Sequence, residues 1–150
     1  MRLSDAYVTI KIYQCGGNGI GRGYITERKE VVVVKVAMIG HKDFPSRSGG
    51  VEVMVGGLAR SLVERGYDVT VYNRGLEKHH NVYDVDGVHA RRVFTLQKPA
   101  LNATIYSFLA TFDALFRGYD VLHYHAIGPS VPLLIAKIFG KHTVCTVHGL

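Results

Sequence analysis

A glycine-rich loop over residues 40–50 is the first feature of this sequence that could do chemistry. Gly49 and Gly50 come just before Glu52, where a helical pattern begins. Consecutive glycines at a helix start let backbone N–H groups approach an anion, and the helix dipole favours negative charge there. With Arg47 as a mobile positive charge, we expect the loop to face a phosphate; the alternative is a flexible loop whose glycines merely permit a turn. Glu52 either caps the helix or orients a ligand.

Histidines at the ends of two predicted strands are the second candidate. His125 ends one apolar run and His148 ends another. At the rim of a sheet, an imidazole can hydrogen-bond a sugar hydroxyl or a phosphate, or act as an acid or base. We expect His123 to point to the opposite face of its strand from His125 and to be a buried structural residue.

The elements that would position these residues alternate between strands and helices. Runs of β-branched and aromatic residues predict strands, apolar residues at helical spacing predict helices, and the pair Asp86-Gly87 predicts a β-hairpin. This alternation predicts an α/β fold with a Rossmann-like, doubly wound parallel sheet, which binds ligands at the carboxyl ends of its strands. The predicted strands cover 31–39, 68–72, 121–125 and 143–148, the hairpin 81–94, and the helices about 51–65, 102–117 and 128–139.

Two helices carry more specific expectations. Gly56 and Gly57, inside the first helix, are expected to allow close packing between that helix and a strand. Asn102 is expected to cap the second helix. The apolar face of the second helix is predicted to consist of Ile105, Phe108, Leu109, Phe112 and Phe116.

The pattern covers only part of the chain. Residues 31–150 predict one Rossmann-like domain, whereas residues 1–30 fit this scheme poorly and are expected to form a loosely attached extension. The chain stops just after a predicted strand, at the rim where a site would be built. We therefore expect an incomplete domain from a longer protein.

Composition argues against several classes of protein. The chain holds 18 Lys and Arg against 12 Asp and Glu, a net charge of +6, but no basic run interleaved with aromatic residues, so we expect no nucleic-acid partner. Cys15 and Cys145 match no metal or redox spacing, so no metal is expected. Without a signal peptide or a run of 18 apolar residues, we expect a cytoplasmic protein, free or in peripheral contact with the inner membrane surface.

Several motifs together resemble one family. They are Lys35-Val-Ala-Met-Ile-Gly40, a Pro-x-x-x-Gly-Gly-x-Glu loop from Pro45 to Glu52, Asp120-Val-Leu-His-Tyr-His125 with Pro129, and Thr146-Val-His148-Gly149. Residues 35–150 thereby resemble the amino-terminal domain of the retaining glycosyltransferases of family 4. The likeness is strongest to the rhamnosyltransferase-like branch.

The resemblance implies a GT-B fold, in which a first Rossmann-like domain binds the acceptor and a second holds the nucleotide sugar. It implies sugar transfer to a glycan or lipid-linked acceptor with retention, in polysaccharide biosynthesis, without a cofactor or an obligatory metal. Gly49 and Gly50, with Arg47, Glu52 and His125, would serve substrate and donor-diphosphate binding.

His148 would lie beside the transferred sugar as the catalytic candidate. The family's Glu-x7-Glu motif of donor binding belongs to the second domain and does not occur in these 150 residues. We therefore expect the chain alone to be inactive.

Other functions remain open at this point. Asn73-Arg74 after the second strand could serve an NADP-dependent Rossmann oxidoreductase, but Gly40 and Gly49 are nine residues apart, so the loop lacks the Gly-x-Gly-x-x-Gly turn. A non-catalytic Rossmann-like binding module is the other alternative. A sugar-nucleotide epimerase of the same architecture is compatible with this half as well.

Overall fold

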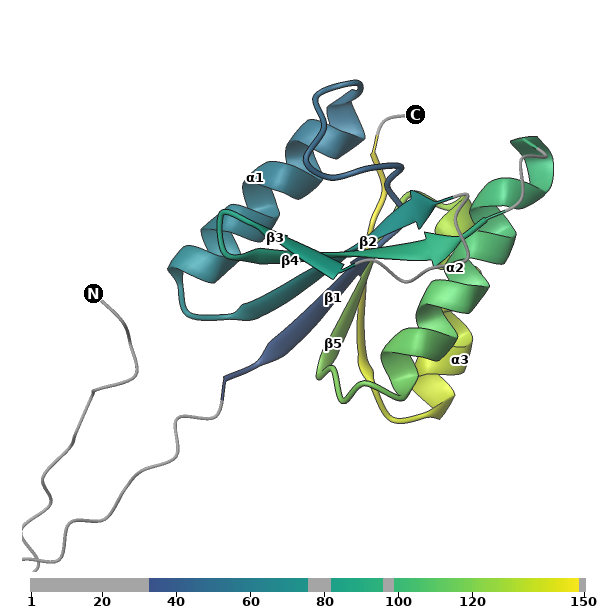
Figure 1. The fold of residues 1–150 in the computed structure, drawn as a ribbon. Helices are drawn as coiled ribbons and strands as arrows, with labels where there is room; N and C mark the ends of the chain where they lie inside the picture. Colours follow the sequence, from purple (N-terminus) through teal and green to yellow (C-terminus); the bar gives the residue numbers. More distant parts are fainter. Residues whose placement is uncertain (1–32, 76–81, 96–98, 149–150) are drawn as a thin grey trace, which may run out of the picture. The chain divides into compact units, whose positions relative to one another are not determined.

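The computed structural model describes residues 33–75, 82–95 and 99–148, with the side chains of 99–101 left out. The predicted extension over residues 1–30 lies outside the described residues. Strands and helices alternate along the chain (Figure 1). In order they are β1 (Lys35–Ile39), α1 (Gly50–Glu64), β2 (Asp68–Gly75), β3 (Val82–Val85), β4 (Val88–Phe94), α2 (Pro99–Leu115), β5 (Val121–His125), the 3-10 turn η2 (Gly128–Ser130), α3 (Leu133–Ile138) and β6 (His142–Thr146).

One six-stranded sheet forms the centre of the described residues, in the order β3-β4-β2-β1-β5-β6. All neighbouring pairs are parallel except β3 with β4. Helix α1 covers one face of the sheet, and α2 and α3 cover the other (Figure 1). Each face has its own core of buried apolar side chains. The predicted doubly wound, Rossmann-like α/β fold is confirmed.

Local signals in the sequence placed two turns correctly. Asp86 and Gly87 have φ angles of 53° and 77° between the antiparallel strands β3 and β4, as a two-residue hairpin turn with left-handed backbone requires. Gly66, with φ of 88°, ends α1. Its N–H bonds the Val63 carbonyl while the Tyr67 N–H bonds the Leu62 carbonyl, which is the Schellman arrangement.

The predicted start of the second helix was wrong. Helix α2 begins at Pro99, so Asn102 lies inside its first turn and caps nothing. The Oδ1 of Asn102 instead accepts a hydrogen bond of 2.7 Å from the Thr95 hydroxyl. This contact links α2 to the end of β4.

The predicted apolar face of α2 was also wrong in part. The Leu109, Phe112 and Phe116 side chains are exposed, Phe116 by 83%. Smaller and hydroxyl-bearing residues of α2 face the sheet instead. The Thr111 hydroxyl lies 2.9 Å from the Tyr124 hydroxyl. The Tyr106 hydroxyl donates a hydrogen bond to a carbonyl of β2. Small side chains let the helix approach the strands closely, and the hydroxyls are hydrogen-bonded there. The fully buried residues of the helix are Tyr106, Ser107, Ala110, Thr111 and Ala114.

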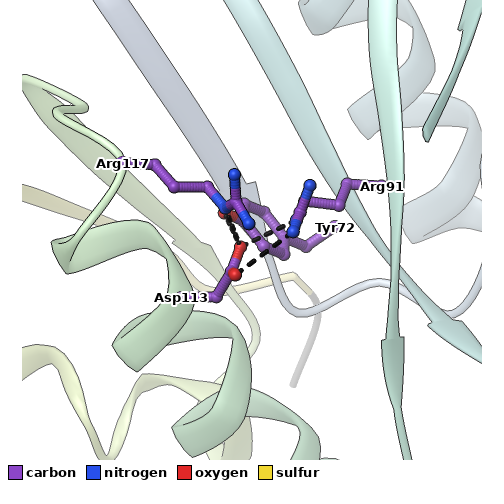
Figure 2. Close-up of polar contacts among 4 residues, drawn as sticks. All are labelled: Tyr72, Arg91, Asp113 and Arg117. Carbon is purple, nitrogen blue, oxygen red and sulfur yellow. Dashed lines mark hydrogen bonds and ion pairs between the residues drawn. The ribbon is translucent and has the colours of Figure 1, made fainter. Parts of the chain in front are cut away.

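A cluster around the Asp113 carboxylate joins α2 to the sheet (Figure 2). The carboxylate accepts hydrogen bonds from the Tyr72 hydroxyl at 2.9 Å, the Arg91 Nε at 2.8 Å and the Arg117 Nε at 2.7 Å. Burial alone would raise the pKa of Asp113. The bonds from Arg117, Tyr72 and Arg91 outweigh burial and hold that pKa below its usual value.

Replacing Asp113 by Asn should lower the free energy of unfolding by about 2 kcal/mol at pH 7, because charge-assisted hydrogen bonds are lost at a largely buried site. Because the folded-state pKa is lowered, the carboxylate's contribution is complete above its ordinary pKa of about 4 and is lost as the pH falls further. Urea denaturation of both proteins at pH 7 and pH 3 should show the difference shrinking in acid.

Asp86→Asn is the matched control for this prediction. The Asp86 carboxylate pairs with Arg60 at 2.7 Å, but both side chains are largely exposed, so the change should cost less than about 1 kcal/mol. Equal losses from the two substitutions would contradict the role given to Asp113.

Candidate functional site

The carboxyl edge of the sheet is built around a close approach between β1 and β5. Gly40 follows β1 with φ of +124°, and a Cβ there would lie 2.1 Å from the carbonyl oxygen of His125. Only glycine fits this position. The next residues of the chain turn over the strand ends, where the Lys42 carbonyl accepts the N–H of Arg74 at 2.9 Å.

The loop ends at the amino terminus of α1, where the two predicted glycines lie. Gly49 is the residue before the first turn and Gly50 begins the helix, and no described side chain caps it. First-turn N–H groups have no partner within a helix and carry its positive dipole end. A Cβ on Gly50 would meet no described atom within 4 Å, so this helix start is sterically open. Arg47, two residues before Gly49, is exposed.

Glu52 is buried, with 7% of its surface exposed. Its Oε1 accepts a hydrogen bond of 3.3 Å from the Lys42 N–H, and its Oε2 lies 2.5 Å from the position of a Cβ on Gly49. The Glu52 carboxylate is therefore hydrogen-bonded to the loop, not to an amide in the first turn of the helix. The carboxylate links the two ends of the loop.

An open hollow of about 660 Å³ lies between this loop and α1, and both Arg47 and Glu52 line it. Gly57 lines it too, and a Cβ there would meet no described atom within 4 Å. On Gly56, a Cβ would lie 3.5 Å from the Phe44 ring. The two glycines face the loop and the hollow, so the expectation that they pack against a strand was wrong. The full lining is Phe44, Pro45, Ser46, Arg47, Glu52, Val53, Gly56, Gly57 and Arg60.

The side-chain amide of Asn73, on β2, holds the loop that follows β1. Asn73 is fully buried, and its Nδ2 donates to the Phe44 carbonyl at 2.7 Å and to the Tyr83 hydroxyl at 2.8 Å. The Tyr83 hydroxyl donates to the same carbonyl at 2.7 Å. Both amide hydrogens are therefore used, and Oδ1 remains as the acceptor facing His41 Nε2 at 2.8 Å.

These bonds fix the tautomer of His41. An amide oxygen can only accept, so His41 must carry its proton on Nε2 and present a bare lone pair at Nδ1. The ring is 1% exposed, and burial lowers its pKa to about 4. His41 is therefore a neutral, buried hydrogen-bond acceptor at neutral pH.

The histidines of β5 lie on one face of the strand, contrary to the expectation of opposite faces. Residues two apart in a strand share a face, and the His123 and His125 rings stack with centroids 4.2 Å apart. The Nδ1 of His125 lies 3.0 Å from Nε2 of His148, so the structure brings these two predicted site residues together. His123 is half-buried and bonds the Thr146 hydroxyl at 2.8 Å.

The environment lowers the pKa of both histidines of β5. Burial, with smaller contributions from His123, His148 and His41, lowers the pKa of His125 to about 3. Burial beside His148 also lowers the pKa of His123. His123 and His125 are therefore uncharged at neutral pH.

The structure thus assembles the predicted residues in two groups. Arg47, Gly49 and Glu52 belong to the loop and α1, and His125 and His148 belong to the ends of β5 and β6. His41 lies near both groups, since it interacts electrostatically with Glu52 of the first group and with His125 of the second. The sequence analysis assigned no role to His41. Its position directly after Gly40, at the end of a predicted strand, is the signal that could have indicated a place at the carboxyl edge.

Two other chemistries can be compared with the residues of this edge, a metal site and a dinucleotide site. Among the described residues, no group of three or more His, Cys, Asp or Glu side chains could hold a metal ion. Of the pair Asn73-Arg74, the Asn73 amide is committed to His41, Phe44 and Tyr83, so only Arg74 would remain for the 2′-phosphate of NADP. None of the helices in the described residues has the length and hydrophobicity of a membrane span.

Comparison with known proteins identifies one family. The model described as Glycosyltransferase Family 4 matches residues 48–150, which include Gly49, Gly50, His125 and His148. No curated protein matches the chain.

The lowered pKa values of His41 and His125 predict that the stability of the fold depends on pH. Because His41 and His125 have lowered pKa values in the folded state and 6.5 is usual, their contribution is complete above about pH 6.5 and is lost as the pH falls toward 4. Urea denaturation should show the free energy of unfolding falling by about 1 to 2 kcal/mol per pH unit there. His41→Gln should reduce this slope, and His142→Gln, at an exposed position, should not. A flat profile between pH 6.5 and 4 would contradict the burial described.

Proposed function

Because the chain belongs to glycosyltransferase family 4, we propose that it serves the transfer of a sugar from a nucleotide-sugar donor to a glycan or lipid-linked acceptor. The Rossmann-like fold matches one half of a GT-B glycosyltransferase. We assign the acceptor side of the site to this domain and propose that transfer proceeds with retention, in a rhamnosyltransferase-like enzyme of polysaccharide biosynthesis. No cofactor enters the proposal, since the nucleotide sugar is itself the substrate.

The open amino terminus of α1 is the observation that carries this proposal. Unpaired N–H groups, the helix dipole and the exposed Arg47 side chain favour a diphosphate at Gly49 and Gly50. In glycosyl transfer, negative charge develops on the departing diphosphate, and fixed donors beside it lower the barrier. The buried carboxylate of Glu52 is held by the loop through Lys42, which keeps the glycine backbone in place.

We assign His148 to the transferred sugar. Its ring is half-buried, so one part rests against His125 and another part is accessible. An imidazole in this position can form a hydrogen bond with a sugar hydroxyl. His125 is a positioning residue in this proposal, because it holds the His148 ring.

In this proposal, binding of the nucleotide-sugar donor requires a second protein domain. The resemblance assigns the nucleotide sugar to a second domain with a Glu-x7-Glu pair, and we propose that this chain does not turn over without such a domain. We further propose a cytoplasmic location with peripheral contact at the inner membrane surface. The exposed apolar side chains of Leu109 and Phe112 on α2, and of Phe116 directly after it, support such contact.

Gly50→Val tests the diphosphate site. A Cβ at this position would meet no described atom within 4 Å, so we expect the fold to persist while the added methyl groups block a diphosphate from the helix start. Titration of the ¹⁵N-labelled chain with inorganic pyrophosphate should shift the Gly49 and Gly50 amide resonances of the wild type. Affinity in the variant should be at least about tenfold weaker.

Gly57→Ala is the matched control, since its position is equally open and lies about 10 Å farther along the helix axis. It should leave pyrophosphate binding unchanged. Unchanged binding in Gly50→Val, or shifts located away from the helix start, would contradict the proposed site.

A further inference from the structure

The contact between His125 and His148 places one hydrogen bond between two imidazole rings. The Nδ1 of His125 lies 3.0 Å from the Nε2 of His148, and the rings are inclined by 20° with their centroids 5.3 Å apart. The centroid separation exceeds the nitrogen separation by nearly the sum of the two ring radii. The rings therefore meet edge to edge, and the two nitrogens point at each other as in an N–H···N hydrogen bond.

The second ring nitrogen of His125 distinguishes the two possible directions of this bond. Its Nε2 is buried and has no hydrogen-bond partner among the described residues. Burial lowers the pKa of His125 to about 3, so at neutral pH the ring has one N–H and one lone pair. If Nδ1 accepted the bond, the N–H would lie on Nε2 without an acceptor. If Nδ1 donates the bond, Nε2 has only a lone pair.

The direction in which His125 donates fits the surroundings better. Buried N–H groups without an acceptor are rarer in proteins than buried acceptors without a donor. The ring is also fixed in its place, because it stacks on His123 with centroids 4.2 Å apart. Its backbone is held against Gly40, where a Cβ would lie 2.1 Å from the His125 carbonyl oxygen. The proton of His125 is therefore expected on Nδ1, between the two rings.

We propose that His125 donates its Nδ1–H to His148 and thereby fixes His148 as the Nδ1–H tautomer, so that His148 serves the reaction as a hydrogen-bond donor and not as a general base. The Nε2 lone pair of His148 is occupied by His125, and its Nδ1 carries the proton. No lone pair remains to accept a proton from a substrate. The tautomer follows from the contacts of His125, whereas its use in sugar transfer rests on the proposed function and deepens it.

The test is a long-range ¹H–¹⁵N NMR spectrum of the 150-residue chain at pH 8, above the ordinary histidine pKa of about 6.5. His125 and His148 should each show a protonated Nδ1 and a bare Nε2. For His148, the Nδ1–H form should outnumber the Nε2–H form by about threefold or more, because the alternative leaves a buried donor unpaired. His148→Gln assigns the signals. A proton of His148 found mainly on Nε2 would overturn the proposal without any further variant.

Two substitutions of His125 test whether it sets the tautomer. Asparagine offers an N–H at about the position of Nδ1, so His125→Asn should keep the Nδ1–H form of His148 as the major one. Leucine offers no donor, so His125→Leu should raise the fraction of the Nε2–H form by about threefold or more. Retention in the asparagine variant and loss in the leucine variant is a result that a packing role alone would not give.

Thr146→Val is the matched control on β6. It removes the hydroxyl that bonds His123 at 2.8 Å while the contact between His125 and His148 remains, so the tautomer of His148 should not change. Equal tautomer populations in His125→Leu and in the wild type would show that His125 does not set the proton of His148. If the leucine variant does not fold, the wild-type spectrum and the asparagine variant still decide.

Titration with inorganic pyrophosphate separates this inference from the proposed function. A proton of His148 on Nε2, together with pyrophosphate shifts at the Gly49 and Gly50 amides, would overturn the tautomer alone. The expected tautomer without any pyrophosphate shift would support the role of His125 and contradict the diphosphate site. Failure of both measurements would overturn both proposals.

Discussion

The buried amide of Asn73 is the interaction on which the carboxyl edge of this domain depends. One side chain uses both of its donors and its acceptor, binding the Phe44 carbonyl, the Tyr83 hydroxyl and the His41 ring. A buried amide that lost these partners would carry a large desolvation cost, so the loop and the strand are held in one arrangement. The same bonds decide which nitrogen of His41 carries the proton. A structural contact thereby sets the chemistry of the site.

Around this contact, the edge has two parts that differ in their electrostatics. The start of α1 presents unpaired N–H groups, a positive dipole end and Arg47, which suit an anion. The ends of β1 and β5 present His41 and His125, which burial keeps neutral. A sugar joined to a diphosphate carries both a neutral and an anionic part. In the proposed function, the start of α1 takes the anionic part.

Much of the fold followed from local patterns. The Asp86-Gly87 turn, the glycine that ends α1 and the alternation of strands and helices are signals within a few residues, and each was found where predicted. The exposed face of α2 was misjudged because hydrophobicity alone predicts that Phe112 is buried in preference to Thr111. Thr111 faces the sheet because its hydroxyl meets that of Tyr124, a contact that no local pattern reveals.

The site was predictable only in outline. Glycines before a helix and histidines at strand ends mark the carboxyl edge in the sequence itself. The contact between His41 and Asn73 joins residues 32 positions apart, and the tautomer depends on Tyr83 from a third element. His123 was misplaced through the strand periodicity, since residues at i and i+2 share a face. The sequence therefore indicated where the site lies, and the register of the strands determined what each nitrogen does.

Amide hydrogen exchange in Asn73→Ala, with Asn102→Ala as the control, tests the central claim most directly. Asn102 is a half-buried amide on α2 that bonds Thr95 and does not touch the loop. If Asn73 organises the edge, its loss should speed exchange at Lys42 and shift the His41 Nε2–H resonance, while the amides within β1 and β5 stay protected. Unchanged exchange at Lys42 and an unmoved His41 resonance would show that the loop and the tautomer are set by something else.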